Sequence, residues 1–277
     1  MREFCHKHGE GKKWYLSTAN YAEELFTEAA RKSAIDVLSN LSPKPPTGKR
    51  DPSSLEAVPK ALLPLVHWVA RRQQQDIHWG QVVPLEDAHA LVDTLDWVVR
   101  LPCTCRADTI GDKNARFCFG IGVSALEEPW RKIMRDAIDP SLGVEKLTKD
   151  EAKAALSDLD RRGAMHSVWT FKTPYIGGLC NCDRDCNALR AQMSWDFQVM
   201  FRAEYVARVD PDRCSGCRQC MQQCLFGAMT HSLARGKCDV NELACYGCGI
   251  CRSACKREAI SLAPRAEVPA AARLWGL

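Results

Sequence analysis

The chain has 277 residues, a formal net charge of +4 and an apolar fraction of 46%, which is enough to bury a hydrophobic core. No apolar run approaches the roughly 18 residues that a membrane-spanning helix needs, and the polar first residues contain no apolar stretch typical of a secretory signal. We therefore expect a cytoplasmic protein without a membrane span. In such a reducing compartment its 16 cysteines are expected to bind metal rather than form disulfides.

Within the first 200 residues the apolar pattern predicts mainly helices. They are expected from Asn20 to about Leu38, near 61–75, from Pro84 to about Arg100, and from Thr148 to about Arg162. Thr148 and Glu151 form a capping-box pattern at the start of the last helix, and Gly163 ends it. Residues 42–54 form a proline-rich linker or exposed loop. Residues 1–200 are thus expected to form a mostly helical domain with cysteine-rich loops.

Six cysteines of this region fall into two groups of three, each containing a C-x-C pair. The first group is Cys103, Cys105 and Cys118, and the second is Cys180, Cys182 and Cys186. We expect both groups to build a third metal centre, which is an Fe–S cluster. A structural zinc site, plain buried thiols and a redox-active thiol pair are the alternatives. Asp183 and Asp185 are interpreted as a charged loop face.

Four further features have ordinary structural interpretations. The "CHKH" stretch at 5–8 is typical of a solvated tail. His166 is expected to be a packed or capping histidine, and Cys238, in a predicted strand, a small buried side chain. The "GIGVSA" stretch at 120–125 lacks the surrounding βαβ unit and the acidic partner of a nucleotide-binding fingerprint.

From Tyr205 onward the pattern changes. "YVARVD" alternates like a short strand, and a C-x2-C-x2-C-x3-C array then occurs twice. The first array is Cys214, Cys217, Cys220 and Cys224, and 31 residues later the second is Cys245, Cys248, Cys251 and Cys255. Repetition at a fixed offset indicates a duplicated supersecondary unit.

Residues 205–263 resemble the two-cluster bacterial ferredoxins on this spacing. The resemblance implies a duplicated α+β domain in which each array lends its fourth cysteine to the other cluster. One [4Fe–4S] cluster would be held by Cys214, Cys217, Cys220 and Cys255, and the other by Cys245, Cys248, Cys251 and Cys224. Leu225 and Lys256 stand where the family usually has proline. A pair of zinc sites is the alternative.

The upstream region is similar, more loosely, to the cysteine-rich N-terminal parts of larger ferredoxin-type iron–sulfur proteins. The similarity rests on the segments "CTCR", "RRGAMH" and "LCNCDRDC". The whole chain is therefore predicted to be α+β, with a mostly helical domain at 1–200, a ferredoxin-like domain at 205–263 and a tail at 264–277.

The expected function is single-electron transfer through two [4Fe–4S] clusters, as a carrier or as a subunit of a cytoplasmic oxidoreductase complex. Its partners would be redox proteins such as a flavoenzyme. Basic residues form a docking face or merely a solvated surface: Arg213, Arg218, Arg252, Lys256 and Arg257. The alternatives are a redox enzyme with its active metal site in the N-terminal domain, and a redox sensor. No pattern indicates nucleic-acid binding.

Overall fold

The computed structural model describes residues 13–39, 62–123, 126–137, 143–194 and 198–275, and it has an α+β fold. Its α-helices are α1 (Glu28–Ser39), α3 (Leu63–Ile77), α4 (Leu85–Thr94), α5 (Thr104–Ile110), α6 (Glu127–Ala137), α7 (Lys149–Arg161), α8 (Asn187–Ser194) and α9 (Gln219–Gln223). Its strands are β1 (Gly80–Val83), β2 (Trp97–Leu101), β3 (Cys118–Gly122), β4 (Glu145–Leu147), β5 (Met165–Thr170), β6 (Ile176–Cys182), β7 (Met200–Phe201), β8 (Tyr205–Val209), β9 (Met229–Ser232), β10 (Lys237–Val240) and β11 (Ile260–Pro264). Residues 5–8 and 42–54, for which a tail and a linker were predicted, lie outside the described residues.

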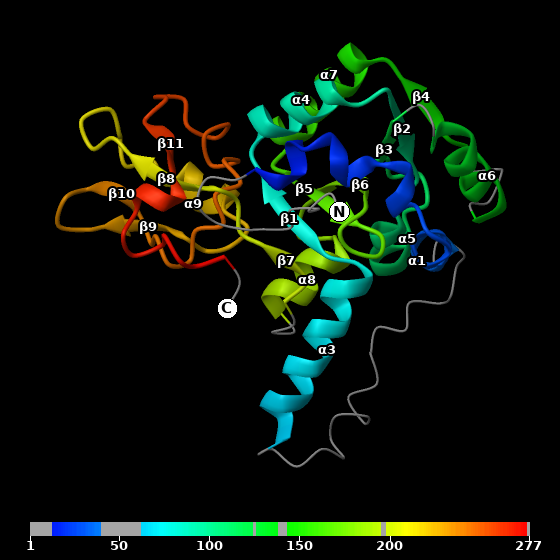
Figure 1. Cartoon of the computed structure of the whole chain (residues 1–277). Coiled ribbons are helices and arrows are strands. Elements are labelled where there is room, and N and C mark those ends of the chain that lie inside the picture. The colour runs from blue at the N-terminus through cyan, green and yellow to red at the C-terminus, as the bar shows by residue number, and fades with distance from the viewer. Residues whose placement is uncertain (1–12, 40–61, 124–125, 138–142, 195–197, 276–277) are drawn as a thin grey trace.

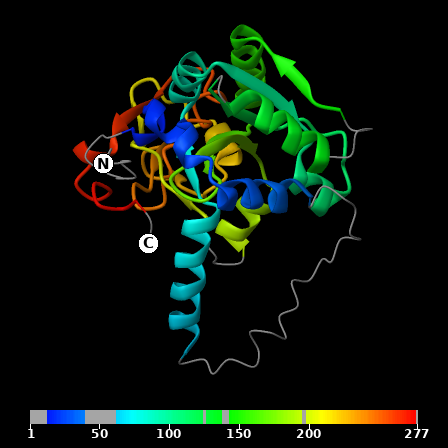
Figure 2. The ribbon, with the colours of Figure 1, turned by 45° about the vertical axis from the view of Figure 1, so that its right-hand side comes forward.

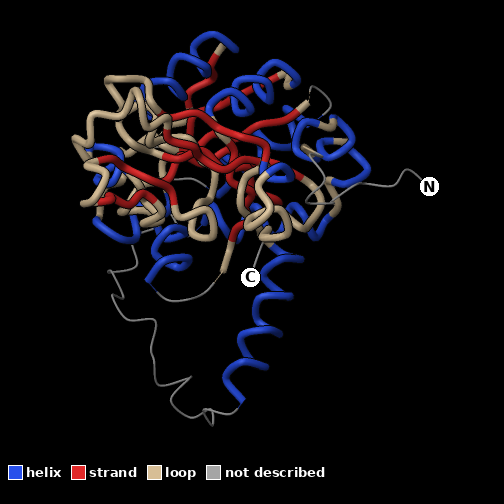
Figure 3. The backbone as a smooth tube through the Cα atoms, turned by 90° about the vertical axis from the view of Figure 1, so that its left-hand side faces the viewer, coloured by secondary structure: helices blue, strands red, loops and turns tan. Residues whose placement is uncertain are grey.

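The first lobe, residues 14–201, is built around a seven-stranded sheet in the order β4-β2-β3-β6-β5-β1-β7. The β1–β7 pair is parallel and the other neighbours are antiparallel. Figure 3 shows strands through the middle of the molecule with helices outside them. The predicted α+β class is confirmed, but the prediction for this lobe did not include the sheet at its centre. The expectation that its cysteines lie in loops is wrong for Cys118, Cys180 and Cys182, which lie on strands.

The sheet escaped prediction because its central strands are buried on both faces. All residues of β1 and all residues of β5 are buried. Such strands show no alternation of apolar and polar residues, which is the usual signature of a strand. The predicted helix beginning at Pro84 likewise ends at Thr94, and residues 97–101 form β2 instead.

Helices cover the two faces of the sheet separately. Leu91 of α4 and Leu156 of α7 pack with Val98 of β2 on one face. Trp130 of α6 packs with Val99 of β2 and with α1 on the other. Neighbouring residues of one strand thus enter different cores, as the two-residue period of a strand requires.

Two of the predicted helices can be compared with the structure at their ends. The capping box of α7 is confirmed: the amide of Glu151 donates to Thr148 Oγ1 over 3.2 Å, and the amide of Thr148 donates to Glu151 Oε2 over 2.8 Å. Gly163 follows with a φ of 87° and ends the helix. The helix expected from Asn20 begins only at Glu28, because short 3-10 turns occupy 18–21 and 23–25.

The second lobe, residues 205–275, holds the two cysteine arrays and lies beside the sheet of the first (Figure 1). It has two antiparallel two-stranded sheets, β8–β11 and β9–β10. The strand predicted at "YVARV" is confirmed as β8. Each small sheet joins the strand before one cysteine array to the strand after the other array. The strands that flank one array therefore pair with the strands that flank the other.

Helix α3 projects away from both lobes, as the two views in Figures 1 and 2 agree. It exposes Leu65, Trp68 and Val69. None of the helices in the described residues combines the length and the apolarity needed to span a bilayer.

Candidate metal centres

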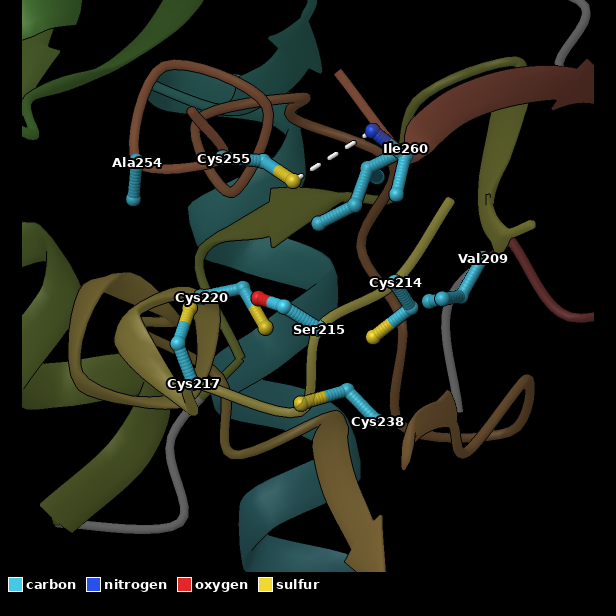
Figure 4. A pocket seen from close by; sticks show the side chains of 10 residues that line it. Val209, Cys214, Ser215, Cys217, Cys220, Cys238, Ala254, Cys255 and Ile260 are labelled. Atoms are coloured by element: carbon cyan, nitrogen blue, oxygen red, sulfur yellow. Dashed lines mark hydrogen bonds between the residues drawn. The ribbon is translucent and has the colours of Figure 1, made fainter. Parts of the chain in front are cut away.

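One cavity of the second lobe is lined by the four cysteines predicted to share one cluster. Cys214, Cys217 and Cys220 come from the first array, and Cys255 comes from the end of the second. Figure 4 shows these four side chains around a common space. The walls of this cavity therefore come from both arrays.

The complementary set also lies together. Burial raises the pKa values of Cys245, Cys248 and Cys251, and the nearby thiol of Cys224 raises each of them further. Cys224 belongs to the first array but is an electrostatic neighbour of the three leading cysteines of the second. Each fourth cysteine thus has cysteines of the other array as neighbours.

Backbone amides point at the sulfurs in a pattern that repeats. Ala228 donates to Cys224 Sγ over 3.2 Å, and 31 residues later Ala259 donates to Cys255 Sγ over 3.3 Å, the dashed line in Figure 4. The amide of Gly216 donates to Cys214 Sγ over 3.4 Å. Because an N–H donor favours the charged form of the sulfur, these loops are suited to hold thiolates.

Two glycines let the loops approach their neighbours. Gly216 and Gly247, 31 residues apart, both have a φ of 71°. A Cβ on Gly216 would lie 2.1 Å from the carbonyl oxygen of Gly236, and one on Gly247 would lie 2.0 Å from that of Tyr205. Only glycine fits at either position, by conformation and by space.

Cys238 is buried on β10, as predicted, with 6% of its surface exposed. The sequence did not show that it also lines the first cavity and touches the thiol of Cys220. Burial and this contact raise the pKa of Cys220 to about 12. Cys238 is therefore a fifth sulfur beside the first predicted ligand set.

Arg265 is a functional candidate that the sequence analysis missed, because it was assigned to a tail. Its side chain is fully buried and donates to the carbonyl oxygens of Ala203, Tyr205 and Cys245 over 2.7, 2.8 and 2.9 Å. Burial lowers the pKa of its guanidinium to about 10, which still leaves it charged at neutral pH. A fixed positive charge thus lies beside the second ligand set.

In the first lobe the six upstream cysteines gather at one place, but in a new grouping. The first thiol trio is Cys103, Cys118 and Cys180, in which Cys118 contacts both others and its Sγ lies 4.0 Å from that of Cys180. The second thiol trio is Cys105, Cys182 and Cys186, in which Cys186 contacts both others and its Sγ lies 3.0 Å from that of Cys182. Each C-x-C pair is divided between the trios.

The fold explains this grouping. Cys118 of β3 and Cys180 of β6 are direct partners across the sheet. Cys182 lies two residues further along β6 and therefore faces the same side as Cys180. Cys103 and Cys105 occupy the N-cap and the first turn of α5, which contacts α8 just after Cys186. The trios lie where β3, β6, α5 and the start of α8 meet.

A buried guanidinium accompanies the first trio. Arg106 is 3% exposed, and its Nη1 donates to Cys103 Sγ over 3.3 Å. Its Nη2 lies 2.6 Å from Asp183 Oδ2, and its charged group lies over the ring of Phe117. Asp183 is thus an ion-pair partner, which agrees with its interpretation as a charged residue rather than a ligand.

His166 is a packed histidine, as predicted, and connects the trios to the second lobe. It is fully buried, and its Nδ1 lies 2.6 Å from Oδ1 of Asn181, the residue between the two cysteines of β6. On its other side Nε2 lies 3.6 Å from Asp160, which accepts a hydrogen bond from Ser253 of the second lobe. This buried polar chain holds the cysteine-bearing end of β6 against the second lobe.

The pKa values of all six trio thiols are raised, which favours their protonated form. Hydrogen bonding to Cys118, and then burial, raises the pKa of Cys103. For Cys180, the hydrogen bond to Cys118 lowers the pKa, but burial and the neighbouring thiols outweigh this effect and raise the pKa to about 12. As placed, no group of three or more Cys, His, Asp or Glu side chains in the described residues has the geometry of a metal site. Because a metal binds the thiolate form of cysteine, binding a metal here would require the trio thiols to lose their protons.

The "GIGVSA" stretch at 120–125 has a structural role in its described part. Gly120, Ile121 and Gly122 belong to β3, and a Cβ on Gly122 would lie 2.4 Å from the Trp97 ring. Ser124 and Ala125 lie outside the described residues.

Compared with known proteins, the chain matches no family model and none of the curated proteins.

Proposed function

We propose that this protein is an iron–sulfur electron carrier, or an electron-transfer subunit of a cytoplasmic oxidoreductase complex. The second lobe would be a duplicated ferredoxin-like unit with two [4Fe–4S] clusters. The observation that carries the proposal is the cavity in which Cys255 of the second array joins Cys214, Cys217 and Cys220 of the first. A pair of independent zinc sites would not need this exchange, because each array could fold around its own ion.

The chain's own residues would prepare both sites for anionic groups. The amides of Ala228 and Ala259 donate to Cys224 and Cys255, and Arg265 sets a buried positive charge next to Cys245. Such donors and charges favour the more negative, reduced state of a cluster. When bound, each cluster supplies one-electron redox chemistry that the side chains lack.

Electron exchange would take place at the edge of the first cavity. Cys217 is exposed, whereas the other seven predicted ligands are buried or half-buried. A hollow nearby along the chain is lined by Asp212, Arg213, Lys256, Arg257 and Glu258. Its mixed charge with a basic excess suits an acidic redox protein, such as a flavoenzyme. Arg252, expected at this face, instead forms an ion pair with Glu86 of the first lobe.

The test is the metal content of the full chain purified without oxygen. We expect about eight iron and eight sulfide per chain, and a paramagnetic signal from two interacting clusters on reduction. Cys255→Ser should remove one cluster's signal while the matched variant Cys238→Ser retains both, because Cys238 belongs to neither ligand set. Zinc filling these sites after anaerobic reconstitution with iron and sulfide would contradict the proposal.

A further inference from the structure

The sulfurs of the two thiol trios lie close to one another. Within the trios, sulfurs lie 3.0 Å apart for Cys182 and Cys186 and 4.0 Å apart for Cys118 and Cys180. Thiolates sharing one tetrahedral zinc ion lie about 3.8 Å apart, because each Zn–S bond is about 2.3 Å long. Thiolates on a [4Fe–4S] cube each bind a different iron and stand around the cube. The 4.0 Å between Cys118 and Cys180 is close to the zinc value, and the 3.0 Å between Cys182 and Cys186 would have to lengthen by about 0.8 Å to reach it, so the trio sulfurs lie near the separation of sulfurs that share an ion.

We propose that the two thiol trios form a binuclear zinc–thiolate site, separate from the two clusters of the second lobe. Each trio would be the main ligand set of one ion. Two four-coordinate ions need eight bonds, which six thiolates supply when one thiolate of each trio bridges to the other ion. Division of each C-x-C pair between the trios places the two sets side by side, which this bridging requires.

The surroundings suit the charge of such a site. On binding, the six thiols lose their protons, so two Zn²⁺ ions and six thiolates carry a net charge of about −2. The buried Arg106 offsets part of it, with its Nη1 3.3 Å from Cys103 Sγ. Backbone amides of Arg106 and Ala188 donate to Cys103 and Cys105, which favours the thiolate form of one sulfur in each trio.

The location indicates a structural role. The site would tie β3, β6, α5 and the start of α8 together, elements far apart in sequence. Arg184, in the loop between Cys182 and Cys186, donates to the carbonyl oxygens of Gln222 and Cys224 over 3.2 and 3.3 Å. Zinc has no redox chemistry, so the site would hold this loop against a predicted cluster ligand without accepting electrons.

The experiment measures zinc, iron and sulfide in the anaerobically purified full chain after removal of loosely bound metal with a chelator. We expect about two zinc in addition to the iron of the second lobe. Cys105→Ser combined with Cys180→Ser removes one thiol from each trio, and should lower zinc at least fourfold while leaving iron unchanged. Cys238→Ser removes a thiol elsewhere and should leave zinc unchanged.

Cobalt substitution gives a second readout on the unmutated chain, which decides the matter should the double variant fail to fold. Co²⁺ in place of zinc should give the intense thiolate-to-metal absorption of a tetrahedral sulfur site, and two Co²⁺ bridged by thiolate should couple magnetically. About twelve iron per chain, with four lost in the double variant, would overturn the proposal in favour of a third Fe–S cluster. Absence of any tightly bound metal beyond the iron of the second lobe would overturn it in favour of structural thiols or a disulfide.

Discussion

The two lobes use the same side chain in opposite ways. In the second lobe four of the predicted ligands line one cavity, and backbone amides donate to two of them. In the first lobe the thiols contact one another within two trios. The difference arises from the backbone: the second lobe presents its cysteines from glycine-containing loops, whereas the first presents three of its six from adjacent strands. Loops can surround a bulky inorganic group, but neighbouring strands bring side chains together in pairs.

The largest effect is expected from a substitution that disrupts a cysteine-bearing loop of the second lobe. Gly247→Ala would place its Cβ 2.0 Å from the Tyr205 carbonyl oxygen at a φ of 71°, so the loop must shift. Gly227→Ala is the matched control, because Gly227 has a φ of 66° with nothing within 4 Å of a Cβ. The control should cost about 1–2 kcal/mol, and Gly247→Ala several times more, with loss of cluster absorbance. Equal thermal unfolding of the two variants would contradict this account.

The pH dependence of stability should have opposite signs with and without metal. In the metal-free chain the buried thiols, such as Cys180 with a pKa of about 12, keep their protons after unfolded thiols ionise near pH 8.5. Unfolded chains then bind fewer protons, so stability present below about pH 8.5 is lost as the pH rises, by about 1.4 kcal/mol per unit for each such thiol.

The metal-loaded chain should behave in the reverse way. Its folded thiolates are unprotonated, whereas unfolded thiols bind protons below about pH 8.5, so stability should fall as the pH falls. Denaturant titrations from pH 6 to 10 under reducing conditions, with and without metal, test both signs. A common slope would show that the thiols hold no metal.

A smaller effect should sharpen the role of Arg265. Replacing it by methionine removes a buried charge beside Cys245, and should lower the reduction potential of one cluster. Arg208→Met, at an exposed position of β8, is the control and should leave both potentials unchanged. Redox titration followed by paramagnetic resonance measures the two clusters separately. An equal shift of both in Arg265→Met would indicate a general loosening of the lobe.

The smallest effect concerns docking. If Lys256 and Arg257 receive an acidic partner, the rate of electron transfer from an acidic flavoprotein should fall with added salt, and replacing both by glutamine should flatten that dependence. Arg208→Gln combined with Arg235→Gln is a matched loss of two positive charges on exposed residues outside the hollow. Stopped-flow measurements at several ionic strengths are the test. Identical salt dependence in all three proteins would leave these residues as ordinary solvated surface.

The sequence by itself determined what depends on short-range spacing. The capping box at Thr148, the strand at Tyr205 and the 31-residue repeat could all be recognised, because each is encoded within a few neighbouring residues. The exchange of Cys224 and Cys255 came only from the ferredoxin resemblance. The spacing alone could not predict this exchange, because two arrays that each bound their own metal could have the same cysteine spacing.

Tertiary structure alone decided the rest. The seven-stranded sheet pairs segments far apart in sequence, and two-sided burial removed the alternation that would have revealed it. The cysteines near 103–118 and 180–186 form two groups in sequence, yet the pairing of Cys118 with Cys180 across two strands and the packing of α5 on α8 sort them differently. Arg265 lies in a presumed tail and acquired its position beside Cys245 only when β11 paired with β8. Long-range pairing, which no local pattern encodes, therefore set both the thiol trios and the charge beside the predicted clusters.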